Sequence, residues 1–172
     1  MAPDLRGAMR AFATGVCVAT TYRDTPGGRR HDAVTVNSLG SISLDPPLVS
    51  LAFRRESAFL GDLLATGRWV VSILPADARD VARRFAGPRA TRVVAGLPAK
   101  PGERTGALVL DGASWLECAL AEKFDLGDHT LVVGEVLATG HERQAPALVF
   151  VHGGYHSITD PRQGPGLWGE AL

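Results

Sequence analysis

Short β-prone segments recur along nearly the whole chain, and they constrain the fold more than any other feature. β-branched and apolar residues gather in seven of them, at residues 16–22, 32–38, 48–53, 69–74, 115–124, 130–139 and 147–151. Helical spacing of apolar residues is confined to three shorter stretches, at residues 5–13, 57–64 and 77–85. Because strands do not alternate regularly with helices, a doubly wound parallel sheet fits poorly. The pattern predicts a mainly β fold, a closed antiparallel barrel with a few short helices.

Local signals indicate how these elements begin and end. Turn chemistry at residues 24–28 predicts a hairpin between the first two strands, and Gly127 predicts a turn for the hairpin of residues 115–139. Ser57 can cap the second helix and Gly67 can end it. The first helix should end near Gly15 and pack on the elements after it.

Two other stretches are assigned by composition and alternation. Residues 87–112 are rich in glycine, proline and single charges, so they are predicted to form a long loop. In the strand at 115–124, Leu116, Cys118 and Leu120 alternate with Glu117 and its neighbours, which predicts a half-buried strand with Glu117 on the outer side.

Length and composition fit one globular domain. The chain has 172 residues, of which 45% are hydrophobic and 21% charged, which suits a single core rather than a disordered or fibrous chain. We expect one domain over residues 1–172, with a core at about 9–158 and a flexible or partner-contacting tail at 159–172.

Charge and hydropathy exclude several partners. The chain carries 18 Lys and Arg against 18 Asp and Glu, so no excess positive field draws it to nucleic acid. No run has the length of a signal-peptide core or a membrane span, so we expect neither membrane nor export, and a cytoplasmic protein. Cys17 and Cys118 lie in apolar surroundings and are predicted to be buried thiols.

The segment after the second strand is unusually polar for β-prone sequence. Four hydroxyls and one amide fall within nine residues, at Thr35, Asn37, Ser38, Ser41 and Ser43. Strand alternation would place Ser41 and Ser43 on the same side. Such a surface could hold a polar ligand. The alternative is a polar barrel edge, with Ser57 as an ordinary helix cap.

The absence of several sequence motifs excludes some kinds of binding site and reaction. The chain has no GxGxxG after a first strand, no GxxxxGK[ST] and no GxSxG, so any nucleotide must be held in another way and serine hydrolysis is not indicated. His152 and His156 are four residues apart, but Gly153-Gly154 makes a helical metal site improbable there. A flavin mononucleotide would need an apolar slot, backbone donors, and hydroxyl or guanidinium groups for its phosphate. Residues 35–43, with Arg54, Arg55 and Ser57 close behind, offer such groups.

The polar run that begins at Thr35 and four further segments together resemble a known family. Together with Arg55-Glu56-Ser57, Arg84-Phe85-Ala86, Gly127-Asp128-His129 and Gly154-Tyr155-His156, this run resembles the flavin reductase family, the small NAD(P)H-dependent reductases of two-component monooxygenases. The resemblance runs from about Met9 to His156. It implies an FMN-binding split β-barrel, antiparallel and Greek-key-like, that forms a homodimer and holds flavin near the subunit interface.

The resemblance also implies roles for particular residues. Thr35, Val36, Asn37 and Ser38 would line the flavin ring. The ribityl and phosphate side would be formed by Ser41, Ser43, Arg55, Ser57, Arg84 and Phe85, and His156 on the closing strand would add to the cofactor site. His129 would position the nicotinamide, although an exposed turn histidine without a role is the alternative.

The implied activity is an NAD(P)H:flavin oxidoreductase. Hydride would pass from NADH or NADPH to FMN, or to FAD, and reduced flavin would reach a separate flavin-dependent oxygenase or halogenase. A flavin-binding carrier or electron-transfer module without reductase activity would use the same residues. A barrel that has lost flavin is the third alternative, because Ala33, Leu39, Glu56 and Ala58 depart from the family pattern.

Overall fold

The computed structural model describes residues 3–141 and 145–158, so the predicted tail at 159–172 lies outside the described residues. The helices are α1 (Leu5–Met9), α2 (Ala58–Thr66) and α3 (Arg79–Ala86), with 3-10 turns η1 (Ala76–Ala78) and η2 (Arg89–Thr91). The strands are β1 (Thr14–Gly15), β2 (Cys17–Thr25), β3 (Gly28–Val36), β4 (Gly40–Leu44), β5 (Pro47–Arg54), β6 (Arg68–Ile73), β7 (Ala99–Pro101), β8 (Leu108–Leu110), β9 (Ser114–Leu126), β10 (His129–Gly140), β11 (Leu148–Val151) and β12 (Gly154–Ser157).

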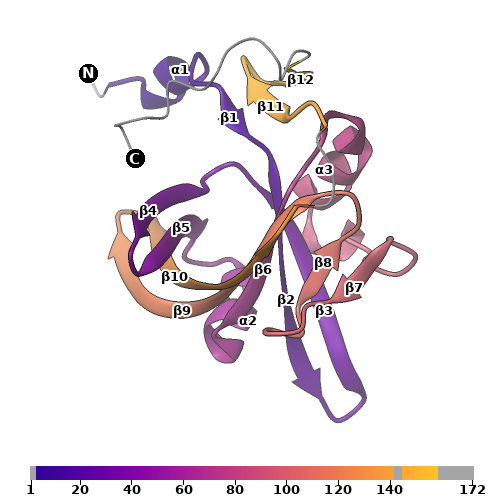
Figure 1. Cartoon of the computed structure of the whole chain (residues 1–172). Coiled ribbons are helices and arrows are strands. Elements are labelled where there is room, and N and C mark those ends of the chain that lie inside the picture. The colour runs from indigo at the N-terminus through magenta and orange to yellow at the C-terminus, as the bar shows by residue number, and fades with distance from the viewer. Residues whose placement is uncertain (1–2, 142–144, 159–172) are drawn as a thin grey trace.

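A curled antiparallel sheet of seven strands dominates the molecule, in the order β3-β2-β6-β9-β10-β5-β4 (Figure 1). The mainly β, antiparallel fold is therefore confirmed. The barrel is not closed by hydrogen bonds, however, because β3 and β4 do not pair among the described strands. An open seam remains where the chain passes from β3 to β4 through residues 37–39.

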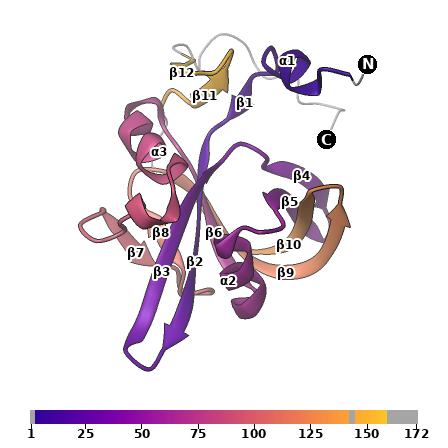
Figure 2. The same cartoon turned by 180° about the vertical axis from the view of Figure 1, so that it is seen from behind.

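The two ends of the main sheet differ. The strands β1, β11 and β12 form a second sheet near α1 at one end, and the β2–β3 hairpin projects at the other (Figures 1 and 2). Both predicted hairpins are confirmed: β2 pairs with β3, and β9 pairs with β10 across a turn at Gly127 and Asp128. Gly127 has a positive φ of 58°, a conformation that glycine adopts without strain.

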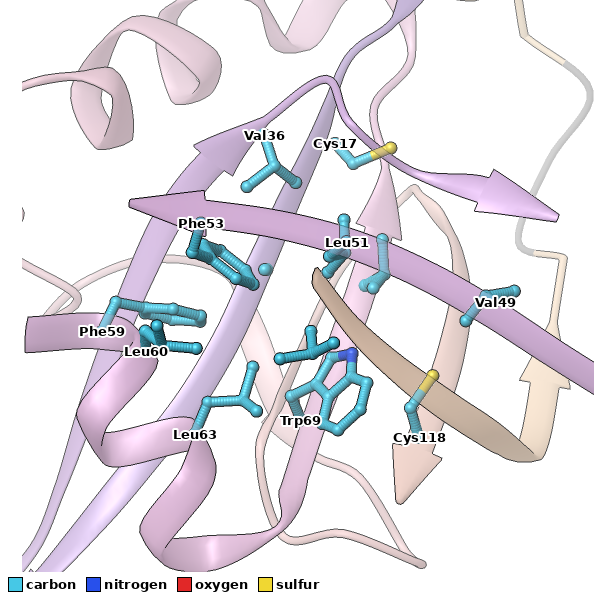
Figure 3. Close-up of a cluster of buried hydrophobic side chains, with 13 residues drawn as sticks. Cys17, Val36, Val49, Leu51, Phe53, Phe59, Leu60, Leu63, Trp69 and Cys118 are labelled. Carbon is cyan, nitrogen blue, oxygen red and sulfur yellow. The ribbon is translucent and has the colours of Figure 1, made fainter. Parts of the chain in front are cut away.

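The main core lies between α2 and the curled sheet. Phe59 and Leu63 on α2 point toward Trp69 on β6, which has no exposed surface (Figure 3). The rings of Phe53 and Phe59 lie 5.3 Å apart between centroids. The predicted caps of α2 are confirmed: Ser57 accepts a hydrogen bond from the Leu60 amide, and Gly67 adopts a left-handed conformation.

The prediction of a long loop at residues 87–112 is wrong. This stretch contains η2 and the β7–β8 hairpin, and it buries Ala107 and Val109. Glu117 is also buried rather than outward-facing, with 1% of its surface exposed. Its carboxylate accepts hydrogen bonds from the Arg104 amide, the Thr105 amide and the Thr105 hydroxyl at 2.8–2.9 Å. The buried carboxylate therefore holds the β7–β8 connection against β9, a long-range contact that local composition does not reveal.

Two smaller expectations also fail. The first helix covers only Leu5–Met9 and has no buried residue, so it does not pack on the rest of this chain. Ser41 lies opposite Val49 and Ser43 lies opposite Leu48, with a register shift at Ile42. Because Leu48 and Val49 project to opposite faces of β5, the two serines do not share a side.

An ion-pair network ties η2 to the body of the molecule. Arg89 contacts both Asp32 on β3 and Asp62 on α2, and Arg23 donates a hydrogen bond to Asp62 at 2.7 Å. Arg92 lies 3.6 Å from Asp32. The two carboxylates are almost completely buried, at 5% and 1% exposed surface, so their charges depend on these arginines.

None of the described helices is long and apolar enough to cross a membrane.

Candidate functional site

A pocket of about 710 Å³ lies along the open seam of the sheet. Its walls come from the end of β3, the end of β5, the turn before α2, the end of α3 and the start of β10. The lining residues are Val34, Thr35, Val36, Asn37, Ser38, Ala52, Phe53, Arg54, Glu56, Ser57, Ala86 and His129. The structure thus brings six of the predicted site residues together, namely Thr35, Val36, Asn37, Ser38, Ser57 and His129.

Three hydroxyls in this wall already have protein partners. Thr35 donates to the Ala82 carbonyl of α3 at 2.6 Å, and the Ser57 hydroxyl caps α2. Ser38 bridges the seam, because its hydroxyl accepts from the Ala52 amide at 3.1 Å and lies 3.3 Å from the Ala52 carbonyl. These hydroxyls shape the pocket, and a ligand would meet them mainly as acceptors with spare lone pairs.

Asn37 is a polar group that is available to a ligand. It is exposed, and none of the described residues bonds to its side chain. It also lines three neighbouring hollows of about 520, 580 and 170 Å³. The seam pocket therefore continues past Asn37 toward α1 and β11, where Phe150 and Tyr155 line the smallest hollow.

His129 lines the same pocket from the first position of β10. It pairs with Arg54 of β5 on one side and with Leu126 of β9 on the other. Its Nδ1 lies 2.7 Å from Oδ1 of Asp128. This hydrogen bond is the main cause that holds the pKa of Asp128 below its ordinary value.

The other predicted residues lie outside the lining of this pocket. Ser41 and Ser43 are on β4, Arg55 is exposed beside the pocket, and His156 is exposed on β12. Arg84 donates to the Ala95 carbonyl at 3.1 Å, and Phe85 is completely buried in the core beneath α3. The neighbours Ala86 and Tyr155 face the hollows instead.

Several lining residues were not among the predicted ones. Alternation along β5 puts Ala52 and Arg54 on the face opposite the core residues Leu51 and Phe53, and that signal could have selected Arg54 over Arg55. The lining residues without a predicted role are Val34, Ala52, Phe53, Glu56 and Ala86, while Arg54 was considered beside Arg55 but not assigned to the site.

The pocket fits part of a flavin in size and chemistry. Its volume lies in the usual range for small-molecule sites, roughly 300–1,000 Å³. Apolar walls at Val34, Val36 and Ala86 suit a ring, Asn37 offers an amide, and Arg54 offers a guanidinium for a phosphate. Glu56 brings a negative charge into the same wall, which weakens an anion site there.

Both cysteines lie in the core, away from any reactive setting. Burial raises the pKa of Cys17 and of Cys118 to about 12, and both cysteines are free. The prediction of buried thiols is confirmed. Within residues 3–141 and 145–158, no cluster of His, Cys, Asp or Glu could hold a metal ion.

Comparison with known proteins decides the family. The model of the flavin reductase like domain matches residues 9–159. The chain belongs to this family. The fold is therefore the split β-barrel of flavin reductases, and the resemblance seen in the sequence is confirmed.

Individual relatives agree with this assignment. The flavin reductase component BorF of a bacterial two-component tryptophan halogenase has a TM-score of 0.81 and 38% identity, covering 91% of this chain and 97% of that chain. The NADH:FAD oxidoreductase SgcE6 of Streptomyces globisporus, in complex with NAD and FAD fragments, has a TM-score of 0.83 and 30% identity, covering 93% of each chain.

A curated relative is longer than this chain. A "Probable flavin reductase" of Rhizobium meliloti (strain 1021) is 33% identical over 151 residues, which cover 88% of this chain and 47% of the relative. The match spans about half the length of that protein.

Proposed function

We propose that this protein is an NAD(P)H-dependent flavin reductase that uses the seam pocket. The observation that carries the proposal is that Asn37 and His129 line one pocket, in a chain that belongs to the flavin reductase-like family. A bound flavin supplies the ring that accepts a hydride from reduced nicotinamide. The protein's contribution is to hold the two rings in an oriented encounter.

We propose a separate contact with the flavin or the nicotinamide for each of several lining residues. Val34, Val36 and Ala86 offer apolar contact for the ring, and Asn37 offers an amide at its edge. Arg54 is the guanidinium best placed for a phosphate, and Ser38 keeps the two sides of the seam at a fixed separation through Ala52. His129 positions the nicotinamide.

The nucleotides are proposed more narrowly than the family alone requires. We propose FMN as the flavin. FAD is the alternative, because SgcE6 is named an NADH:FAD oxidoreductase. NADH is the proposed hydride donor because the name of SgcE6 specifies NADH, and NADPH is the alternative. An assay with each of the four combinations distinguishes them.

A second copy of the chain is the proposed partner in a homodimer. Helix α1 buries no residue in one chain, and Leu5, Met9 and Phe12 are 70%, 50% and 61% exposed. Met9 and Phe12 line hollows that share Asn37 with the flavin pocket. An apolar surface of this kind beside the site is well suited to burial by another subunit.

Reduced flavin is proposed to pass to a separate flavin-dependent oxygenase or halogenase. The support is that BorF is the reductase component of a two-component halogenase. We place the protein in the cytoplasm, where nicotinamide nucleotides are available and the free Cys17 and Cys118 remain reduced.

The role of His129 has a direct kinetic test. His129→Ala should raise KM for the nicotinamide nucleotide more than it raises Kd for the flavin, because the imidazole contacts the nicotinamide. Steady-state kinetics and a flavin titration give the two numbers. His141→Ala is the control, since that histidine is exposed away from the pocket. An unchanged KM in His129→Ala would refute this role.

A further inference from the structure

The contact between Asp128 and His129 beside the pocket indicates which ring nitrogen of His129 carries the proton. We propose that Asp128 is a positioning residue that keeps the proton of neutral His129 on Nδ1, so that Nε2 faces the pocket as a hydrogen-bond acceptor. The group recognised there is then an N–H donor, such as the carboxamide NH₂ of nicotinamide. This inference rests on the proposed function and names the contact that His129 makes.

The direction of the hydrogen bond follows from the carboxylate. Asp128 Oδ1 and His129 Nδ1 are 2.7 Å apart, a normal distance for a charge-assisted hydrogen bond. An ionised carboxylate can only accept, so the proton must be on Nδ1. Hydrogen bonding by His129 lowers the pKa of Asp128, so the carboxylate stays ionised at neutral pH.

The backbone around the pair fixes where Asp128 sits. The Arg55 amide donates to the Asp128 carbonyl at 3.2 Å, which ties the β9–β10 turn to the turn before α2. The turn itself is set by Gly127, and His129 is held in register between Arg54 and Leu126. The backbone of Asp128 is therefore held in place, and its exposed carboxylate lies beside the imidazole of His129.

The Nε2 side of the His129 imidazole is the part available to a ligand in the pocket. His129 lines the pocket, whereas Asp128 is exposed and does not. With Nδ1 occupied by Asp128, Nε2 is the ring nitrogen left for a ligand. The charged groups facing this ring are Asp128 on its own hairpin, with Arg54 and Glu56 from the β5–α2 side.

The acceptor character of Nε2 selects the ligand group. Flavin carbonyls and phosphate oxygens are acceptors, so neutral Nε2 offers them nothing, while Arg54 across the strand pair supplies donors for them. The nicotinamide carboxamide carries an N–H donor. The Nε2 acceptor and the Arg54 donors would thus serve different groups of the bound nucleotides.

Nuclear magnetic resonance tests the tautomer without any nucleotide. Long-range ¹H–¹⁵N spectra of the apo protein, recorded at mildly alkaline pH and assigned with His129→Ala, should show His129 protonated on Nδ1. Asp128→Ala should move the proton to Nε2, the tautomer that free imidazole side chains prefer. Asp128→Asn keeps an acceptor and should keep the Nδ1 proton. Asp125→Asn is the matched control, because Asp125 lies on the same hairpin and accepts from Thr130 instead.

A substrate lacking the donor tests the contact. Reduced 3-acetylpyridine adenine dinucleotide replaces the carboxamide NH₂ by a methyl group. The ratio of kcat/KM for NADH to that for the analogue should fall about 3- to 10-fold in His129→Ala and in Asp128→Ala, the range expected for one lost hydrogen bond. Asp128→Asn should retain most of the ratio, and Asp125→Asn all of it.

The outcomes separate this inference from the proposed function. An Nε2-protonated His129 in the wild type, or an unchanged ratio in His129→Ala, overturns the inference while flavin reduction stands. Absence of NADH oxidation in the wild type overturns the proposed function, and the tautomer of His129 is still measured.

Discussion

At the scale of single residues, Asn37 differs from the hydroxyls around it. Thr35, Ser38 and Ser57 are bonded to Ala82, Ala52 and Leu60, so each supports an element of the fold. None of the described residues engages the Asn37 amide. The Thr35, Ser38 and Ser57 hydroxyls therefore support the fold, whereas the Asn37 amide has no partner among the described residues.

That division predicts opposite effects for two neighbouring substitutions. Asn37→Ala should weaken flavin binding about 3- to 10-fold, the effect of one hydrogen bond, and leave the free energy of unfolding unchanged. Ser38→Ala should lower that free energy by about 1–2 kcal/mol, because the Ala52 amide and carbonyl lose their partner. Flavin titration and urea unfolding of both variants check this. Equal destabilisation by the two changes would contradict it.

The cysteines give a second prediction at this scale. Because burial raises both pKa values to about 12, the thiolate that reacts with disulfides is scarcely populated at pH 8. Neither Cys17 nor Cys118 should react with a disulfide reagent in the native protein, and both should react after unfolding in guanidinium. Rapid labelling of the folded protein would show that at least one thiol is accessible.

Residue types in the sequence indicated the pocket but not the partners of its side chains. The first part of the polar run, residues 35–38, lines the seam pocket, whereas Ser41 and Ser43 do not. The partners of Thr35 and Ser38 lie 47 and 14 residues away, and only folding brings them together. The choice of Arg55 over Arg54 depended on which face of β5 is outward, which alternation along the strand does contain.

At the scale of elements, the ion-pair network links three parts of the pocket's support. Asp32 lies two residues before Val34, Asp62 lies on the helix capped by Ser57, and Arg89 lies three residues after Ala86. Arg89 contacts both carboxylates. The network therefore holds β3, α2 and η2 together behind the pocket.

Removing the central carboxylate should loosen this support. Asp62→Ala leaves Arg23 and Arg89 without their shared partner and should lower the free energy of unfolding by about 2 kcal/mol, less than for a fully buried pair because both arginines are partly exposed. Asp24→Ala is the control, since Asp24 pairs with Arg29 at the surface, and the unfolding midpoint should not move. Urea unfolding at low and high salt measures both variants. Equal effects of the two substitutions would contradict a role for burial.

Elements set by local signals were predicted, and those set by distant packing were not. The long hairpins and α2 carry their own turns and caps, at Gly127, Ser57 and Gly67. The β7–β8 hairpin depends on Glu117 and on burial of Val109, so its sequence alone resembles a loop. Helix α1 has the apolar spacing of a packed helix, but in one chain nothing among the described residues covers it.

At the scale of the whole molecule, the open seam determines where a ligand can bind. Strand order places β3 and β4 at opposite edges of the curled sheet, and the pocket lies beside the connection between them. Strand order follows from long-range pairing, so the sequence predicted a barrel without predicting its open side. The exposed face of α1 lies at the end of the same groove.

The proposed homodimer can be tested through that face. Met9→Asp combined with Phe12→Asp should convert a dimer into a monomer, because two charges cannot be buried in an apolar contact without a large cost. Size-exclusion chromatography with light scattering gives the mass. Val93→Asp is the control, since Val93 is 53% exposed on a different segment. A wild-type monomer, or a dimer that survives both charges, would contradict this interface.

The central claim is that the seam pocket brings reduced nicotinamide and flavin together for hydride transfer. The most direct measurement is NADH oxidation by the purified wild-type protein, followed by loss of its near-ultraviolet absorbance with and without added FMN or FAD. The account predicts catalytic oxidation that depends on flavin and falls in Asn37→Ala and His129→Ala. Flavin binding without NADH oxidation would contradict it and identify a carrier.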